Sequence, residues 1–280
     1  MPLPPPKVLL ATAVFAASLV FCSPVRAQAA PADPDAAVPR ADSIFSTDYL
    51  RQLWHDTGAV LTEPTRWDDS NWEVAGAWTG ATLTAAAFDH RIRTQSQAHW
   101  QSHTDNRFFK DWQMLGMQYS WVEIAAFEGW GVAAHDVEAR NTAMDALTAS
   151  IIAGGIVTPT IKFAVGRYRP SQTSRTFRFR PFSGHQSFPS GHATQAFAIA
   201  TVVASHYTAW WEQTLSYGAA ALVDVARVQQ NRHFASDVVA GSAIGWAVGK
   251  AVVHRHAGPG QVEVTPWFGD GFGLMVSKDF

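Results

Sequence analysis

Four long stretches of this chain carry no ionised side chain, and they restrict its fold more than any other feature of the sequence. The stretches are residues 74–88, 146–161, 193–211 and 238–249. Their many Ala, Gly and Thr residues predict helices that pack closely through small side chains, in a chain that is 47% hydrophobic and 16% charged. Only 193–211 approaches the roughly 20 residues that a membrane-spanning helix needs. A soluble or peripheral bundle is therefore favoured, with membrane-spanning helices as the alternative.

Breaker residues separate seven candidate helices from residue 48 onward. The candidates span 48–61, 72–88, 112–134, 142–168, 192–211, 213–228 and 235–254. Pro159 lies inside the fourth and should kink or split it, because proline removes a backbone hydrogen bond. No strong strand pattern occurs among them. We therefore predict an all-α fold, a helical bundle of about six core helices.

The two ends of the chain differ from this helical body. Residues 1–29 have the pattern of a cleaved export signal, with an apolar run over 8–21 and a small-x-small site at 27–29. A linker rich in Pro, Ala and Asp is expected at 30–44, and the helical domain at 45–256. The tail, 257–280, alternates on both sides of a Gly-Asp-Gly turn, which favours a small β-hairpin over a loose tail. We expect an exported, periplasmic protein, soluble or peripheral, with embedding in the inner membrane as the alternative.

Cysteine content and net charge exclude several classes of function. Cys22 is the only cysteine, and it would leave with the signal, so disulfides and thiolate chemistry are not expected in the mature chain. The formal net charge of −2 gives no reason to expect a nucleic acid as partner. We find no His-Glu-x-x-His pattern and no cluster of carboxylates, so we expect neither a metal site nor a cofactor.

The first segment that carries chemistry runs from Lys162 to Pro170, with the sequence KFAVGRYRP. Lys162 and Arg169 are seven residues apart, two turns of helix, and so share one helix face. Pro170 disfavours helix in the residue before it, which leaves Arg169 at a helix end with its side chain free to reach inward. A dianionic phosphate needs such fixed cations. In isolation the pair is more simply a solvated basic face, and Arg167 is either a supporting cation or exposed.

The second segment, Pro189-Ser190-Gly191-His192, precedes an apolar helical run. It should lead into a helix N-terminus, where unpaired N–H groups and the helix dipole favour an anion. Gly191 allows a close backbone approach, Ser190 can donate a hydroxyl hydrogen bond, and His192 is suited to proton transfer. A near-copy at 183–185 lacks the proline and precedes no helix, so we expect it to be part of a loop.

The third segment combines Arg227 with His233 and Asp237. The histidine and the aspartate are four residues apart, so at a helix start the carboxylate lies under the imidazole and can fix its tautomer. The other ring nitrogen is then free to attack phosphorus. Without the other two segments, this pair would more simply be an ordinary helical His–Asp contact.

Together and in this order, the three segments resemble the lipid phosphatase and haloperoxidase superfamily, the type 2 phosphatidic acid phosphatases. The resemblance covers about 142–253, and it implies a helical bundle with its active site between the central helices. The residues that it implies for binding phosphate are Lys162, Arg169, Ser190, Gly191 and Arg227. It further implies that His192 is the acid and base, His233 the nucleophile and Asp237 its orienting partner. The third segment departs from the family pattern, because Ala226 replaces a serine.

The activity that this resemblance implies is a metal-independent hydrolysis of phosphate monoesters through a phosphohistidine intermediate. The substrate would be a phosphorylated lipid, such as phosphatidic acid or a polyprenyl pyrophosphate, or a soluble phosphoester. Two alternatives are a vanadate-dependent haloperoxidase and a non-catalytic envelope protein that binds phosphorylated ligands. A pure binder needs cations but no histidine–aspartate pair, which favours the enzyme. The arginines and aromatic residues at 171–188 could grip a lipid headgroup, or form a solvated loop.

Overall fold

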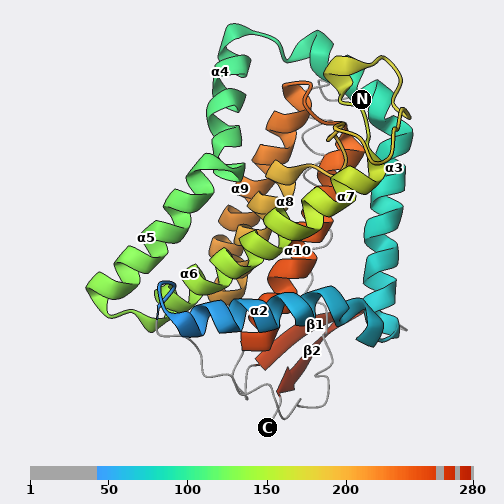
Figure 1. The fold of residues 1–280 in the computed structure, drawn as a ribbon. Coiled ribbons are helices and arrows are strands. Elements are labelled where there is room, and N and C mark those ends of the chain that lie inside the picture. Colours follow the sequence, from blue (N-terminus) through green and yellow to red (C-terminus); the bar gives the residue numbers. More distant parts are fainter. Residues whose placement is uncertain (1–42, 257–261, 269–271, 279–280) are drawn as a thin grey trace.

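The computed structural model describes residues 43–256, 262–268 and 272–278 (Figure 1). The expected signal peptide at 1–29 and nearly all of the linker at 30–44 lie outside the described residues. Within the described residues the body of the chain is a helical bundle, so the prediction of an all-α fold is confirmed.

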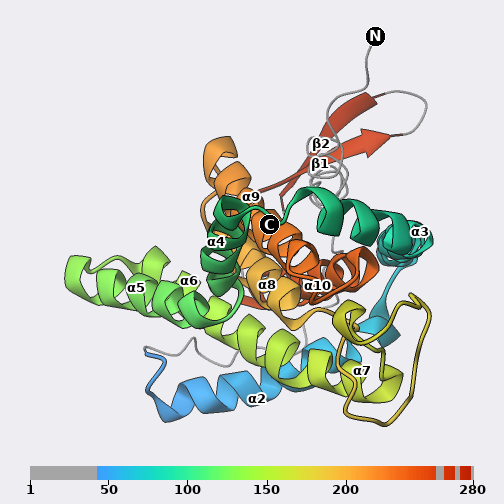
Figure 2. The ribbon, with the colours of Figure 1, turned by 90° about the horizontal axis from the view of Figure 1, so that it is seen from above.

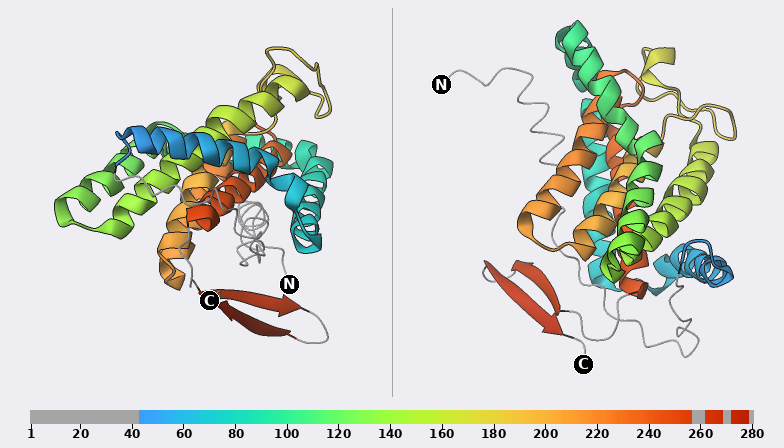
Figure 3. Two further views of the ribbon diagram at one scale, coloured as in Figure 1. Left: turned by 60° about the horizontal axis from the view of Figure 1, so that its bottom comes forward. Right: turned by 90° about the vertical axis from the view of Figure 1, so that its left-hand side faces the viewer.

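All seven predicted helices are present, with shifted ends. In chain order the helical elements are α2 (Thr47–Thr62), η1 (Glu63–Arg66), α3 (Asp69–His99), α4 (His103–Trp112), η2 (Gln113–Gly116), α5 (Gln118–Ala134), α6 (Val137–Ala149), η3 (Ser150–Val157), α7 (Thr158–Val165), η4 (Pro170–Gln172), α8 (Gly191–His206), α9 (Trp210–Gln229) and α10 (Ala235–His256). The bundle consists of α3, α5, the continuous run from α6 to α7, α8, α9 and α10, while α2 lies across one end (Figures 1 and 3).

Polar side chains start several of these helices. Ser46 accepts a hydrogen bond from the backbone N–H of Tyr49 at 3.0 Å and so caps α2. Asp68 caps α3 in the same way through Asn71 at 2.9 Å. Such caps satisfy N–H groups that have no partner inside the helix. The helix ends are thus fixed locally, before any packing between helices.

Two departures from the prediction have local causes. Helix α4 was not predicted, because its sequence is mostly polar and its apolar side consists of closely spaced aromatic rings. The predicted helix at 142–168 is continuous but changes its bonding pattern: η3 is a π-helix, and the N–H of Thr158 bonds to Ala153 five residues back. Pro159 follows directly, in the first turn of α7, where a missing N–H costs least.

Helix α8 is the centre of the bundle, and its residues from Ala193 to Val202 are buried (Figure 2). Helix α10 lies against it at very short distance because three of its glycines face α8. A Cβ atom on Gly245 would fall 2.2 Å from the carbonyl oxygen of Thr194, and one on Gly241 would fall 2.5 Å from that of Ser190. This contact between backbones sets the distance between the beginnings of α8 and α10.

Two further expectations concern a hairpin in the tail and helices that could cross a membrane. Strand β1 (Val262–Phe268) pairs antiparallel with β2 (Phe272–Lys278), so the hairpin predicted for the tail is present. By length and composition, the runs Val137–Val165 and Ala235–His256 could each cross a membrane. In the apolar 18-residue window of each run, 33% of the residues are buried inside the bundle for Val137–Val165 and 67% for Ala235–His256.

At the end of the bundle covered by α2, histidines and carboxylates alternate in a chain of contacts. The rings of His206 and His256 both bond to Asp145, each at 2.7 Å, and His256 also bonds to Asp56 of α2 at 2.9 Å. Although burial lowers it, the hydrogen bonds to Asp145 and Asp56 raise the pKa of His256 to about 9. A histidinium therefore ties α2 to α6 and α10.

The pKa of His256 is raised on folding, so the protonated ring stabilises the protein fully at pH values below the ordinary histidine pKa of 6.5. This contribution is lost as the pH rises through about 9. We expect His256→Gln to lower the free energy of unfolding by about 2–3 kcal/mol at pH 6, and by much less at pH 9.5. Urea unfolding followed by circular dichroism measures this. His254→Gln, on the same helix end but outside the network, is the control. An equal loss at both pH values would contradict the histidinium.

Candidate functional site

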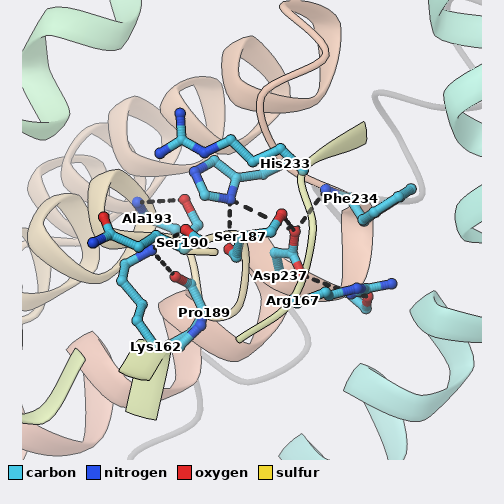
Figure 4. A network of polar contacts seen from close by, with 12 residues as sticks. Lys162, Arg167, Ser187, Pro189, Ser190, Ala193, His233, Phe234 and Asp237 are labelled. Atoms are coloured by element: carbon cyan, nitrogen blue, oxygen red, sulfur yellow. Dashed lines mark hydrogen bonds and ion pairs between the residues drawn. The ribbon is translucent and has the colours of Figure 1, made fainter. Parts of the chain in front are cut away.

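The three segments picked out in the sequence meet at the end of the bundle opposite α2 (Figures 1 and 4). The ammonium group of Lys162, on α7, donates hydrogen bonds to the carbonyl oxygens of Gln186 at 2.8 Å and Pro189 at 2.6 Å. The N–H of Ser190 donates to the carbonyl oxygen of Asp237 at 2.8 Å. These bonds join the first segment to the second and the second to the third.

Ser190 and Gly191 form the start of α8, as the sequence suggested. Ser190 is fully buried and is the N-cap, with its hydroxyl oxygen 3.4 Å from the N–H of Ala193. A Cβ atom on Gly191 would lie 3.7 Å from the Cε atom of Lys162, so the first turn of α8 faces this cation. A helix N-terminus next to a lysine attracts an anion through its free N–H groups and its dipole.

His233 is 3% exposed, and its Nδ1 atom lies 2.7 Å from the carbonyl oxygen of Ser187. A carbonyl only accepts, so Nδ1 carries the proton and Nε2 has a free lone pair. The predicted partner Asp237 is farther from Nδ1, at 3.6 Å, within the range of an ion pair. Its carboxylate accepts hydrogen bonds from the Ser187 hydroxyl at 2.6 Å and the N–H of Phe234 at 2.9 Å. Asp237 therefore positions the imidazole mainly through Ser187 and the start of α10.

Arg167, which the sequence left open, is a buried structural cation. It is 2% exposed, and its guanidinium bridges Asp89 of α3 at 2.8 Å and Asp237 at 2.6 Å. Ser236 completes the network: its hydroxyl accepts from Arg167 at 2.7 Å and donates to Asp89 at 2.6 Å. Ser187 and Ser236 were not predicted, although both are sequence neighbours of motif residues. Asp89 lies far away in sequence, and no motif marks it.

Several cations around the site lack an acidic partner among the described residues. Arg227 donates one hydrogen bond to the amide oxygen of Gln113, while its buried Nε–H has no partner. Burial, followed by the charges of Arg169 and Arg232, lowers the pKa of Arg227 to about 10. Burial and Arg232 also lower the pKa of Arg169. Arg232 is therefore a further cation of the site that the sequence reasoning did not propose.

His192 lies among these cations. Burial, followed by the charges of Arg227 and His233, lowers its pKa to about 3. Burial also lowers the pKa of His233 to about 4, against the opposing effect of the nearby Asp237 carboxylate. The charges of Lys162 and Arg227 act on both imidazoles, so both rings lie near the same cations. An anion bound among them would raise both pKa values.

An apolar cavity of about 200 Å³ lies along α8, between that helix, α5 and α9. Its lining includes Leu115, Phe127, Ala196, Ile199, Val203 and Val223. Positions 196, 199 and 203 follow His192 by 4, 7 and 11 residues and so share its helix face. Glu123 also lines the cavity, and burial raises the pKa of its carboxyl group to about 7.

The near-copy of the second segment at 183–185 is part of a loop, as predicted. His185 stacks on the ring of Tyr168 with 3.4 Å between ring centroids. In the described part of the chain, no three His, Cys, Asp or Glu side chains are grouped so that they could hold a metal ion.

The family comparison agrees with the three segments. Residues 143–259 match the family model described as the PAP2 superfamily, and this range includes all three segments. The chain contains a PAP2 superfamily domain. Helices α6 to α10 make up this PAP2 domain, and α3 lies outside it while supplying Asp89 to its buried network.

Among curated proteins, the PAP2 domain is similar to two lipid A 1-phosphatases. The protein from Porphyromonas gingivalis is 36% identical over 108 residues, which cover 38% of this chain and 22% of the relative. The protein from Rhizobium etli is 32% identical over 119 residues, covering 40% of this chain and 50% of the relative. The chain thus aligns with half or less of the length of these relatives.

Among solved structures, one similar chain is a transmembrane PAP2-type phosphatidylglycerolphosphate phosphatase from Bacillus subtilis. It has a TM-score of 0.47 and 18% sequence identity, and the comparison covers 64% of this chain and 93% of that one.

Removing the guanidinium of Arg167 should leave two buried carboxylates without their shared partner. We expect Arg167→Met to lower the free energy of unfolding by about 3–5 kcal/mol, measured by urea denaturation. Arg175→Met, an exposed arginine eight residues on, is the control and should cost little. Adding Asp89→Asn to Arg167→Met should recover part of the loss, because one uncompensated charge is removed. No recovery would contradict the network.

Arg227 is the first of the charges that lower the pKa of His192. We expect Arg227→Gln to raise this pKa from about 3 toward its ordinary value of 6.5. The measurement is an NMR titration of 15N-labelled histidine rings. Arg178→Gln, which removes an exposed cation stacked on Tyr168, is the control. An unchanged His192 titration in Arg227→Gln would show that the two side chains do not share a site.

Proposed function

We propose that this chain is a phosphatase that removes a phosphate group from a phosphorylated lipid through a phosphohistidine intermediate. The observation that carries the proposal is the group of two imidazoles and several cations, including the unpartnered Nε–H of Arg227, around one helix N-terminus. Such a set has an excess of positive charge that a tetrahedral oxyanion would neutralise. The similarity to lipid A 1-phosphatases supports a lipid phosphate as the substrate class.

In the first step, the phosphate group of the substrate binds to Lys162, Arg169, Arg227 and the N–H groups that open α8. The lone pair of His233 Nε2 attacks phosphorus, and the bond between phosphorus and the ester oxygen breaks. His192 gives its proton to that oxygen, so the alcohol leaves neutral. The hydrogen bond from Nδ1 to Ser187 keeps Nε2 aimed at the phosphate, and the nearby Asp237 stabilises the positive charge on the phosphorylated ring.

In the second step, water attacks the phosphorus atom of the phosphohistidine. His192, now neutral, takes a proton from this water, and the bond between phosphorus and Nε2 breaks. Inorganic phosphate leaves, and both histidines return to their starting state. The low pKa of His192 fits this cycle, because the dianionic substrate itself raises it and so loads the acid only when substrate is bound.

The apolar cavity along α8 favours a substrate with a hydrocarbon chain over a soluble phosphoester. Its lining begins on α8 at Ala196, one helical turn after His192, on the side to which the rest of an ester could extend. Apolar chains gain free energy from such a surface, and small soluble alcohols do not.

We further propose that the protein is exported and associates with a membrane. Two helical runs of sufficient length and many exposed apolar side chains support membrane association. Cell fractionation decides its form: release by osmotic shock indicates a soluble periplasmic protein, release from membranes by high salt a peripheral one, and a need for detergent an embedded one.

The phosphatase proposal is tested with the purified chain, p-nitrophenyl phosphate and phosphatidic acid, in the presence of a chelator. We expect turnover of both substrates and a loss of at least about 10³-fold in kcat for His233→Ala. His185→Ala, the histidine of the near-copy, is the control and should keep activity. Brief incubation with 32P-labelled substrate should give acid-labile label on the wild type and none on His233→Ala. Full activity of His233→Ala would refute the nucleophile.

A further inference from the structure

Residues 171–188 form a loop beside α7 that we call the rim loop (Figure 2). Three of its four phenylalanines are exposed: Phe177 to 65%, Phe179, which also packs on Arg167, to 44%, and Phe182 to 72%. Phe163 of α7, 57% exposed, lies beside Phe182 with the two rings edge to face at 5.6 Å. Four exposed aromatic rings thus gather on one side of the site, which is unusual for a surface that only meets water.

Backbone hydrogen bonds hold these rings in place. The N–H of Tyr168 donates to the carbonyl oxygen of Arg178 at 3.0 Å, and that of Arg180 donates to Gly166 at 2.8 Å. A Cβ atom on Gly166 would lie 1.8 Å from the carbonyl oxygen of Arg180, and this glycine has a φ of +60°. The loop is therefore pinned to the end of α7, and the rings cannot fold inward to a core.

The rim loop is also strongly basic. Arg175, Arg178 and Arg180 are all exposed and alternate with the phenylalanines. No Asp or Glu occurs between Asp145 and Glu212, so no carboxylate from the loop or its flanking helices neutralises these charges. A surface of exposed aromatic rings and unneutralised arginines complements the headgroup layer of an anionic membrane.

The C-terminal end of the rim loop is part of the site itself. The carbonyl oxygens of Gln186 and Ser187 accept hydrogen bonds from Lys162 and His233, respectively. The N-terminal half is fixed to the same network, since Arg167 donates to the carbonyl oxygen of Thr176 at 2.7 Å. A surface that binds the rim loop therefore lies next to the groups that would bind phosphate.

We propose that the rim loop docks on an anionic lipid surface, with its phenylalanines among the headgroups and its arginines on lipid phosphates. This contact presents the site to substrates held in the membrane, so it deepens the proposed function and rests on it for its role in turnover. The charge of the loop favours lipid over a protein partner, because three arginines without acidic neighbours match a continuous layer of phosphates.

The first test compares two substrates on the full chain in detergent micelles. One is phosphatidic acid in dodecyl maltoside with phosphatidylglycerol, and the other is p-nitrophenyl phosphate. We expect Phe177→Ser with Phe182→Ser, and separately Arg175→Gln with Arg180→Gln, to lower kcat/KM for phosphatidic acid about tenfold. The value for p-nitrophenyl phosphate should change less than about twofold, because neither pair touches the phosphate site. Arg66→Gln, an exposed arginine at the α2 end, is the matched control.

The second test needs no turnover. In a Cys22→Ser background, Phe177→Cys is labelled with the environment-sensitive dye NBD, and Arg66→Cys is labelled as the control. Adding phosphatidylglycerol to the micelles should shift the emission of the dye at position 177 to the blue, and neutral phosphatidylcholine should not. The dye at position 66 should respond equally to both lipids.

The outcomes separate the two proposals. No blue shift at position 177, or an equal loss of activity on both substrates, overturns the rim-loop proposal and leaves the phosphatase proposal intact. Blue-shifted emission at position 177 in a chain that hydrolyses neither substrate supports lipid docking and refutes the phosphatase. Loss of the lipid activity without a response to phosphatidylglycerol overturns lipid docking in favour of another partner of the loop.

Discussion

The site depends on one buried ion pair network, in which the guanidinium of Arg167 lies between Asp89 and Asp237. Arg167 comes from the end of α7, Asp89 from α3 and Asp237 from α10, so a single cation holds three helices in register. Burying charges is costly unless each is paired and hydrogen bonded, and here Ser236 and the carbonyl oxygen of Thr176 take up the remaining donors and acceptors. Asp237, fixed in this way, fixes Ser187, and Ser187 orients His233.

This network also explains the charge of the site. Asp237 is the one carboxylate of the three motif segments, and Arg167 and Ser187 already occupy its oxygens. The cations nearer to His192 therefore remain without an acidic partner in the described chain. Repulsion among Arg169, Arg227 and Arg232 disfavours the empty arrangement, and an anionic ligand relieves it. The paired charges of Asp89, Arg167 and Asp237 hold the helices together. The cations near His192, which have no such partner, are the groups that would bind an anion.

Much of the fold and of the site could be predicted from the sequence, because both have local signals. Uncharged, Ala-rich runs indicated the central helices, and the resemblance of the three segments to a known family put Lys162, His192 and His233 in one candidate site. The partner nearest to His233 could not be predicted, since it is a backbone carbonyl, which leaves no trace in residue identity. Asp89 was missed for another reason: it lies outside the three segments, and only tertiary packing brings it to Arg167. The π-helix of η3 could not be predicted either. It differs from an α-helix only in which backbone carbonyl accepts each hydrogen bond, and the apolar residues there give no sign of that difference.

The close contact of α8 with α10 through Gly241 and Gly245 has a consequence for how this protein can diverge. Because main chain meets main chain there, the distance between the start of α8, which carries His192, and the start of α10, which follows His233, does not depend on the size of a side chain. Peripheral helices can exchange their residues, tilt or lengthen to suit a different lipid while the reactive centre keeps its dimensions. Substitutions in the peripheral helices should therefore change which substrate binds more readily than they change which bond is hydrolysed.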